Sequence, residues 1–218
     1  MASMIFKIRI LYFLVTLSFF LSSVFNLNAQ IKKEHLKLGF SYGVGSQNKF
    51  PFNSKDYKHE VDFYKLLVNY TLKEKGNWSY EFHIEPSINI VQHQLLNKWF
   101  IKPTDSENYE ALRELYTQNR EITEYVLNLG LLVRYKFYKD LSTYVIGSIG
   151  PMTSNKPTER LAKGYAFSDI LGLGFSYEFN KILLDFRCSI RHTSNLQFKT
   201  PNNGHNTSNI EFGAMFQL

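Results

Sequence analysis

The chain has 218 residues, a formal net charge of +6, and 16% aromatic residues. Its mean hydropathy is slightly negative, which argues against a helical membrane protein. The positive charge includes Lys7 and Arg9 near the N-terminus and forms no arginine-rich stripe, so nucleic acid is not an expected partner. The single cysteine, Cys188, excludes an intrachain disulfide.

Residues 1–29 have the layout of a secretory signal peptide. Lys7 and Arg9 precede an apolar run at 10–21, and small and polar residues follow as far as Ala29. An N-terminal membrane anchor is the weaker alternative, because the apolar run is short for a transmembrane helix. We therefore expect cleavage after Ala29 and an exported domain of residues 30–218.

Apolar and polar residues alternate in eight segments of the remaining chain, which is the pattern of β-strands. One set of alternate positions is apolar and rich in aromatics, whereas the other carries charged residues, His, Asn and Gly. Outer-membrane barrels have this pattern because lipid lies outside them and polar side chains fill the interior. The predicted fold class is all-β, an eight-stranded antiparallel transmembrane β-barrel of the cell outer membrane. The segments are 36–45, 63–72, 78–90, 125–137, 141–150 (of ambiguous parity), 165–179, 184–191 and 209–218.

The connections between these segments alternate in length. Short periplasmic turns and long outer loops are typical of such barrels. With both ends of the barrel in the periplasm, the connection between the seventh and eighth segments lies on the outer side. Residues 106–119 of the longest connection are expected to form a short amphipathic helix. The short connections are 73–77, 139–140 and 180–181, and the long ones are 46–60, 92–123, 151–164 and 195–207.

His192 and Ser194 lie two residues apart at the end of the seventh segment, so they project from one face of a strand. An imidazole beside a hydroxyl is the minimum for an activated serine. The pair continues the apolar row of that strand, which is expected to face lipid. Polar groups there are costly and suit an enzyme with a lipid substrate. The alternative is that the strand has left the membrane and both are ordinary loop residues.

The end of the chain carries a longer motif around this pair: His192-x-Ser194-Asn195, then Lys199-x-Pro201-Asn202-x-Gly204, then a closing apolar strand. This motif resembles that of the lipid A 3-O-deacylase family of outer-membrane barrels. The resemblance implies a serine esterase that hydrolyses the 3-O-linked acyl ester of lipopolysaccharide at the lipid-facing surface. It also implies lipid A and other outer-membrane lipids as partners and no metal or other cofactor. A homodimer is a further expectation.

By the same resemblance, Ser194 is the nucleophile and His192 its general base. The family's oxyanion-stabilising asparagine falls on Asn202, and a backbone N–H near Gln197 would be the second donor. Asn195 matches the asparagine that follows the nucleophile and is included with the oxyanion residues.

The third catalytic position departs from the family, because Asn206 stands where a glutamate is expected. The nearest downstream acid, Glu211, falls on the lumen side by parity, whereas Asn206 shares the face of His192. An asparagine can accept the imidazole N–H and hold its tautomer, but it cannot offset the imidazolium charge, so a slower enzyme is expected. His205 is expected to point away from the site, as a loop residue. The alternatives are a catalytically silent barrel with a structural or surface-binding role, and a phospholipase.

Glu81, His83 and Glu85 alternate on the lumen side of the third segment. They have the residue types of a metal site. A buried charge network is the favoured interpretation, because many other charges share the lumen side. Those charges are Lys65, Arg134, Lys136, Asp185, Arg187 and Arg191.

Overall fold

The computed structural model describes residues 33–218, so the predicted signal peptide and its cleavage point lie outside the described residues. No described helix is long and apolar enough to cross a membrane. The elements in chain order are η1 (Lys33–His35), β1 (Leu36–Ser46), β2 (Tyr57–Lys75), β3 (Trp78–Leu95), η2 (Lys98–Phe100), α2 (Tyr109–Thr117), β4 (Arg120–Tyr138), β5 (Leu141–Ser154), β6 (Gly164–Phe179), β7 (Ile182–Ser194) and β8 (His205–Gln217).

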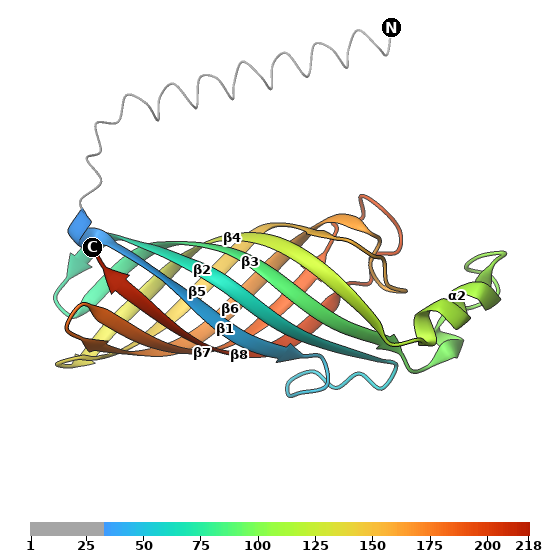
Figure 1. Cartoon of the computed structure of the whole chain (residues 1–218), viewed down its shortest axis with the longest axis horizontal. Coiled ribbons are helices and arrows are strands. Elements are labelled where there is room, and N and C mark those ends of the chain that lie inside the picture. The colour runs from blue at the N-terminus through green and yellow to red at the C-terminus, as the bar shows by residue number, and fades with distance from the viewer. Residues whose placement is uncertain (1–32) are drawn as a thin grey trace, which may run out of the picture. The chain divides into compact units, whose positions relative to one another are not determined.

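The eight strands form a closed barrel in which each strand pairs with its sequence neighbours (Figure 1). Antiparallel pairing of β1 with β8 closes the ring, with Lys37 opposite Gln217 at one end and Ser46 opposite Ser208 at the other. Closure leaves no strand edge unpaired, which is what a sheet needs in order to cross a bilayer. The predicted all-β barrel fold is confirmed.

Burial alternates along the strands with a period of two. In β5, which was ambiguous from sequence, Tyr144 and Ile146 point inward and are buried, whereas Val145 and Ile149 point outward and are exposed. The outward side chains form an apolar surface, because large hydrophobic residues on all eight strands are exposed there. This is the inverted arrangement of a protein that has lipid as its outer solvent.

Buried ion pairs fill the middle of the lumen. Lys65 Nζ lies 2.6 Å from Glu211 and 3.4 Å from Glu85, and Arg187 Nη1 lies 2.6 Å from Glu85. Each charge has at least two opposite partners, which offsets the large cost of desolvation. Glu81, His83 and Glu85 therefore belong to a charge network. Lys136 departs from the prediction, because it lies exposed at the barrel mouth with Glu178.

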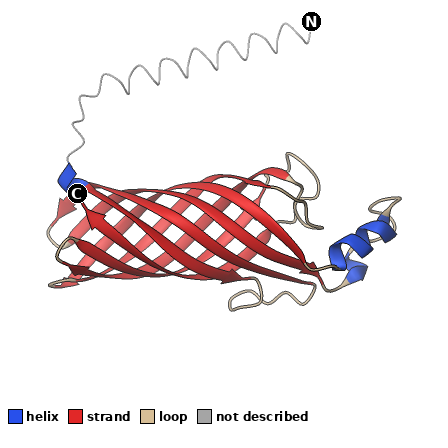
Figure 2. Cartoon of the chain, in the orientation of Figure 1, coloured by secondary structure: helices blue, strands red, loops and turns tan. Residues whose placement is uncertain are grey.

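The connections are asymmetric, with tight turns at one end and long loops at the other (Figure 2). The turns are 76–77, 139–140 and 180–181, and the long connections are 47–56, 96–119, 155–163 and 195–204. The strands extend further at the outer end than the alternation predicted. The outward side chains there become polar, as in the exposed pair Lys58–Glu60, so the hydrophobic pattern ends although backbone pairing continues. Helix α2 lies within the predicted range 106–119.

Candidate active site

Three neighbouring strands place one polar side chain each in a single row on the outer surface. Asp169 of β6 pairs with His192 of β7, and His192 pairs with Asn206 of β8. Directly opposed residues of an antiparallel sheet project from the same face, with Cβ atoms about 5 Å apart. All three side chains line one pocket of about 210 Å³, together with the apolar side chains of Leu171 and Ile190.

The imidazole of His192 is held by Asn206. Nδ1 of His192 lies 2.7 Å from Oδ1 of Asn206. Since a carboxamide oxygen only accepts, Nδ1 carries the proton and donates it, which leaves the lone pair on Nε2. The backbone N–H of Asn206 donates to Oε1 of Gln47, 2.9 Å away, so the loop after β1 in turn fixes Asn206.

Ser194 is the last residue of β7 and lies one step further out on the same face as His192. Its partner on β6 is Phe167, and the serine is partly buried. Within residues 33–218, no hydrogen bond joins the Ser194 hydroxyl to His192. A nucleophile and its base often meet at hydrogen-bonding distance only once substrate is bound, so their common face and spacing are the relevant geometry.

The loop after Ser194 turns back sharply through two residues with left-handed backbone, Leu196 at φ 51° and Gln197 at φ 62°. Asn195 is fully buried beneath this turn and braces it. Its Nδ2 donates to the carbonyl of Lys199 at 2.6 Å, and its backbone N–H donates to Oδ1 of Asn202, also at 2.6 Å. The loop therefore has a defined shape of its own.

These contacts distinguish the three residues that were expected to stabilise the oxyanion. Asn195 uses its backbone N–H and its Nδ2 in hydrogen bonds within the loop, so both of these donors are already occupied. Asn202 accepts through Oδ1, and its Nδ2 makes no hydrogen bond within the described chain. The backbone N–H of Gln197 is likewise unpaired among the described residues. Asn202 Nδ2 and Gln197 N–H are thus the two available donors.

Gly204 lies where the 195–204 loop packs against His192. Its φ of +66° is left-handed, and a Cβ at this position would lie 2.3 Å from the carbonyl oxygen of Thr193 and 3.3 Å from Cε1 of His192. Only glycine combines this conformation with such a close approach. The motif's glycine therefore allows the loop to pack directly behind the imidazole.

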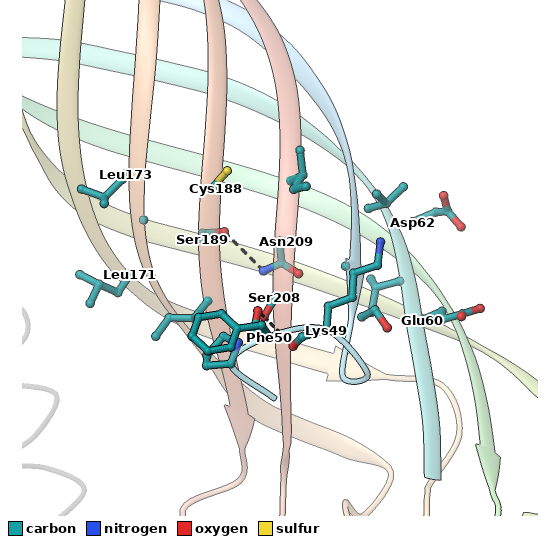
Figure 3. A pocket seen from close by; sticks show the side chains of 18 of the residues that line it. Lys49, Phe50, Glu60, Asp62, Leu171, Leu173, Cys188, Ser189, Ser208 and Asn209 are labelled. Atoms are coloured by element: carbon teal, nitrogen blue, oxygen red, sulfur yellow. Dashed lines mark hydrogen bonds between the residues drawn. The ribbon is translucent and has the colours of Figure 1, made fainter. Parts of the chain in front are cut away.

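A long apolar groove of about 740 Å³ continues from the His192 pocket across the outer surface. The two hollows share Leu171 and Ile190. Figure 3 shows this groove with Leu171, Leu173 and Cys188 along the strands and with Lys49 and Phe50 of the 47–56 loop beside Ser208. The hydroxyl of Ser208 anchors that loop by donating to the carbonyl oxygens of Lys49 and Phe50, 3.2 and 2.8 Å away.

Asp169 was not predicted from the sequence. Its Oδ1 is buried and has no hydrogen-bond partner among the described residues, although the side chain is only partly buried. The sequence feature that could have identified it is an acidic residue in the otherwise apolar outward row of β6, between Phe167 and Leu171. A carboxylate on a lipid-facing row is costly and points to a function.

Two other polar residues near the motif face the lumen. Glu211 is buried in the ion-pair network and contacts Lys65, so it lies on the opposite side of the wall from His192. His205 also points inward, but it is the first residue of β8 and is buried, so the prediction of a loop residue was wrong. Backbone pairing with Thr193 continues the strand to His205.

Comparison with known proteins identifies the family and the fold. The family model described as "Lipid A 3-O-deacylase (PagL)" matches residues 62–214, which is more than half of the chain. This chain belongs to the PagL family. Its fold resembles that of the outer membrane enzyme PagL, with 9% identity, 81% of this chain and 97% of that chain covered, and a TM-score of 0.55. Neisserial surface protein A is also similar, with 6% identity, 84% and 97% covered, and a TM-score of 0.51.

A search of curated proteins found none that matches the chain. At these low identities the structural likeness establishes the fold alone, whereas the family match establishes membership. The PagL-family chain is accordingly an outer-membrane β-barrel of an ester-hydrolase family. The row of Asp169, His192 and Asn206 lies near the outer end of the wall, close to the last residue of β7.

Proposed function

We propose that this PagL-family barrel is a serine esterase that removes the 3-O-linked acyl chain of lipid A from the outer leaflet. The observation that carries the proposal is the 2.7 Å contact between His192 and Asn206 on the lipid-facing side of β7 and β8, with Ser194 on the same face. A base with a fixed tautomer beside a hydroxyl is the arrangement that activates a serine.

In this mechanism Nε2 of His192 takes the proton from the Ser194 hydroxyl as Oγ attacks the ester carbonyl. The tetrahedral oxyanion is stabilised by Nδ2 of Asn202 and the backbone N–H of Gln197. The intermediate collapses when His192 returns the proton to the departing sugar oxygen, which leaves an acyl-serine. Water, deprotonated by His192, then attacks the acyl-serine and releases the fatty acid.

Asp169 supplies the negative charge that Asn206 lacks. Asn206 fixes the imidazole by a neutral hydrogen bond, whereas the carboxylate of Asp169 lies across β6 and β7 on the other side of His192. Directly opposed residues have Cβ atoms about 5 Å apart, so the unpaired Asp169 carboxylate lies close to the His192 ring. Near the apolar band the effective dielectric constant is low, and the carboxylate therefore stabilises the positive charge that develops on the imidazole. The two functions of a family glutamate are thus divided between two residues.

The apolar groove is suited to the acyl chain. It begins at the His192 pocket and is lined largely by side chains such as Leu171, Leu173 and Ile190. A chain lying in it keeps apolar contacts while its ester carbonyl reaches Ser194. Lys49 of the 47–56 loop also lines the groove and offers a cation to the phosphate of a lipid headgroup.

Mass spectrometry of lipid A from cells that express the chain tests the proposal. We expect loss of one hydroxyacyl chain with the wild type and no loss with Ser194→Ala. Thr153→Ala, which removes an exposed outward hydroxyl from β5, is the matched control and should retain activity. Heat-dependent migration on gels checks that every variant forms the barrel.

Two results would overturn the assignment in distinct ways. Unchanged lipid A with a folded wild-type barrel would favour a catalytically silent surface protein. Release of fatty acids from phospholipids, with lipid A unchanged and with the same dependence on Ser194, would indicate a phospholipase. The expected homodimer has no support from the family match.

A further inference from the structure

Three histidines from distant parts of the sequence meet inside the outer mouth of the barrel. His59 of β2 and His93 of β3 are cross-strand partners, and His205 of β8 stacks on His59 with ring centroids 4.2 Å apart. One ring nitrogen from each residue lies within 4.8 Å of the other two. All three side chains are buried, and the active site on the outer face of the wall uses none of them.

One nitrogen of this cluster lacks the partner that a buried polar group normally has. Nδ1 of His59 and Nδ1 of His93 lie 3.0 Å apart, so at most one proton can be shared between them. Nδ1 of His205 is buried and has no hydrogen-bond partner within residues 33–218. Leaving a buried polar atom unsatisfied is costly and calls for an explanation such as a bound ion. Once the proton between His59 and His93 is displaced, the three side chains offer three nitrogen lone pairs to one small volume.

The opposite edges of two rings are held by the 155–163 loop. Nε2 of His93 lies 2.8 Å from Oε2 of Glu159, and Nε2 of His205 lies 2.9 Å from Oγ1 of Thr158. A carboxylate that binds the far nitrogen of a histidine is the usual support of a metal-ligating imidazole. Oε1 of Glu159 is also buried and has no partner within the described chain.

We propose that His59, His93 and His205 bind one divalent transition-metal ion of the zinc class, with Glu159 supporting His93. Three imidazoles suit zinc, and tetrahedral coordination with bonds of about 2.0–2.1 Å requires nitrogen atoms roughly 3.3 Å apart. The 3.0 Å contact between His59 and His93 is close to that spacing, and the nitrogen of His205 lies within 4.8 Å of both, so side-chain rotation has to bring it nearer to complete the site. The Glu159 carboxylate contributes an opposite charge.

Two arginines lie near the cluster. Arg191 Nη2 is paired with Glu124 at 2.8 Å, whereas the Arg160 guanidinium lies over the ring of Tyr57 at 4.7 Å and donates to the carbonyl of Gly204 at 2.9 Å. A hollow of about 740 Å³ between the outer loops and α2 is lined by Thr158 and Glu159, the two residues that hold the far edges of His205 and His93. The site therefore has three ligands and a supporting carboxylate.

The position of the site indicates a structural role. A bound ion would join the rim of β2 and β3 to the start of β8 and to the 155–163 loop. His205 directly precedes Asn206 and follows Gly204, the residues that contact or pack against His192. The ion would therefore stiffen the base of the catalytic loop from the lumen side, without taking part in the ester chemistry. This inference is independent of the proposed deacylation.

Metal titration of the purified full chain in detergent micelles tests the site. After treatment with a chelator, calorimetry should show one equivalent of Zn²⁺ bound, and Co²⁺ should give the intense visible absorption of tetrahedral coordination. Zn²⁺ should also raise the thermal unfolding midpoint. His205→Gln should abolish stoichiometric binding. His35→Gln, which alters a histidine at the other end of the barrel, is the matched control and should bind as the wild type does.

Glu159→Gln guards against variants that fail to fold, because it keeps all three imidazoles and alters only the supporting carboxylate. We expect a 10- to 100-fold weaker Zn²⁺ affinity, as is typical for such partners. The proposal is overturned if the folded wild type binds no Zn²⁺, or if His205→Gln binds it as tightly as His35→Gln. Neither result depends on deacylase activity, so a negative metal titration and a negative lipid A assay can be told apart.

Discussion

His192 and Asn206 face each other across β7 and β8, with Nδ1 of the imidazole 2.7 Å from the carboxamide oxygen. In the proposed mechanism this contact orients the base, but it brings no charge to the imidazolium that forms. In Asn206→Glu the added carboxylate should raise kcat by about 10-fold, since a close opposite charge is typically worth a pK unit or more. Steady-state deacylation with the purified variant measures this change. A slower Asn206→Glu enzyme would contradict the assigned position.

Asp169→Asn tests whether the Asp169 carboxylate stabilises the positively charged imidazole of His192. We expect kcat to fall by about 10-fold or more with KM nearly unchanged, because charge stabilisation matters only in the transition state. Glu121→Gln, which alters an exposed outward carboxylate on β4 bonded to Gln92, is the control and should have little effect. The decisive readout is the double variant. Adding Asn206→Glu to Asp169→Asn should restore most of the lost rate, whereas a merely structural Asp169 would not be rescued.

Asn202 has two functions that one substitution can separate. Oδ1 braces the loop by accepting the Asn195 N–H, and Nδ2 is the proposed oxyanion donor. Asn202→Asp keeps the acceptor and removes the donor, so kcat should drop by roughly 10²–10³-fold while the fold is retained. Asn203→Asp changes an exposed neighbour and should retain most activity. Equal activity of the two variants would remove Asn202 from the site.

Gly204→Ala should impair activity through backbone geometry. The added Cβ would lie 2.3 Å from the carbonyl oxygen of Thr193, and the left-handed φ of +66° costs any other residue about 1 kcal/mol or more. The loop must therefore move away from His192. We expect a lower kcat with a barrel that still folds, as measured by deacylation and by gel migration. Gly76→Ala, at a turn with open space around it, controls for the left-handed backbone alone.

Arg187→Met should destabilise the barrel from within. Arg187 is buried between Glu85 and Glu211, so its loss leaves two carboxylates with less compensation. Removing one partner of a buried ion pair typically costs about 3–5 kcal/mol. Equilibrium unfolding in urea measures the difference. Lys136→Met removes an exposed pair with Glu178 at the mouth and should change the free energy of unfolding by less than about 1 kcal/mol.

The sequence by itself determined the strands and their faces. Side chains alternate with a period of two, so local pattern alone placed Asn206 on the face of His192 and Glu211 on the other face. The same pattern set the number of strands and the lengths of the turns. It failed at the outer strand ends, because the outward side chains there, such as Lys58 and Glu60, are polar and the buried inward ones include His59 and His93, so hydrophobicity no longer reports direction.

Only the tertiary structure decided which residues meet across strands. The register of β6 on β7 brings Asp169 opposite His192, and closure of the ring brings His205 to His59 and His93. Hydrogen bonding also decided that Asn195 is used within the loop and leaves Asn202 with a free donor. These contacts join residues far apart in the chain, and their pairing depends on strand register and barrel closure, which no local pattern of one sequence contains.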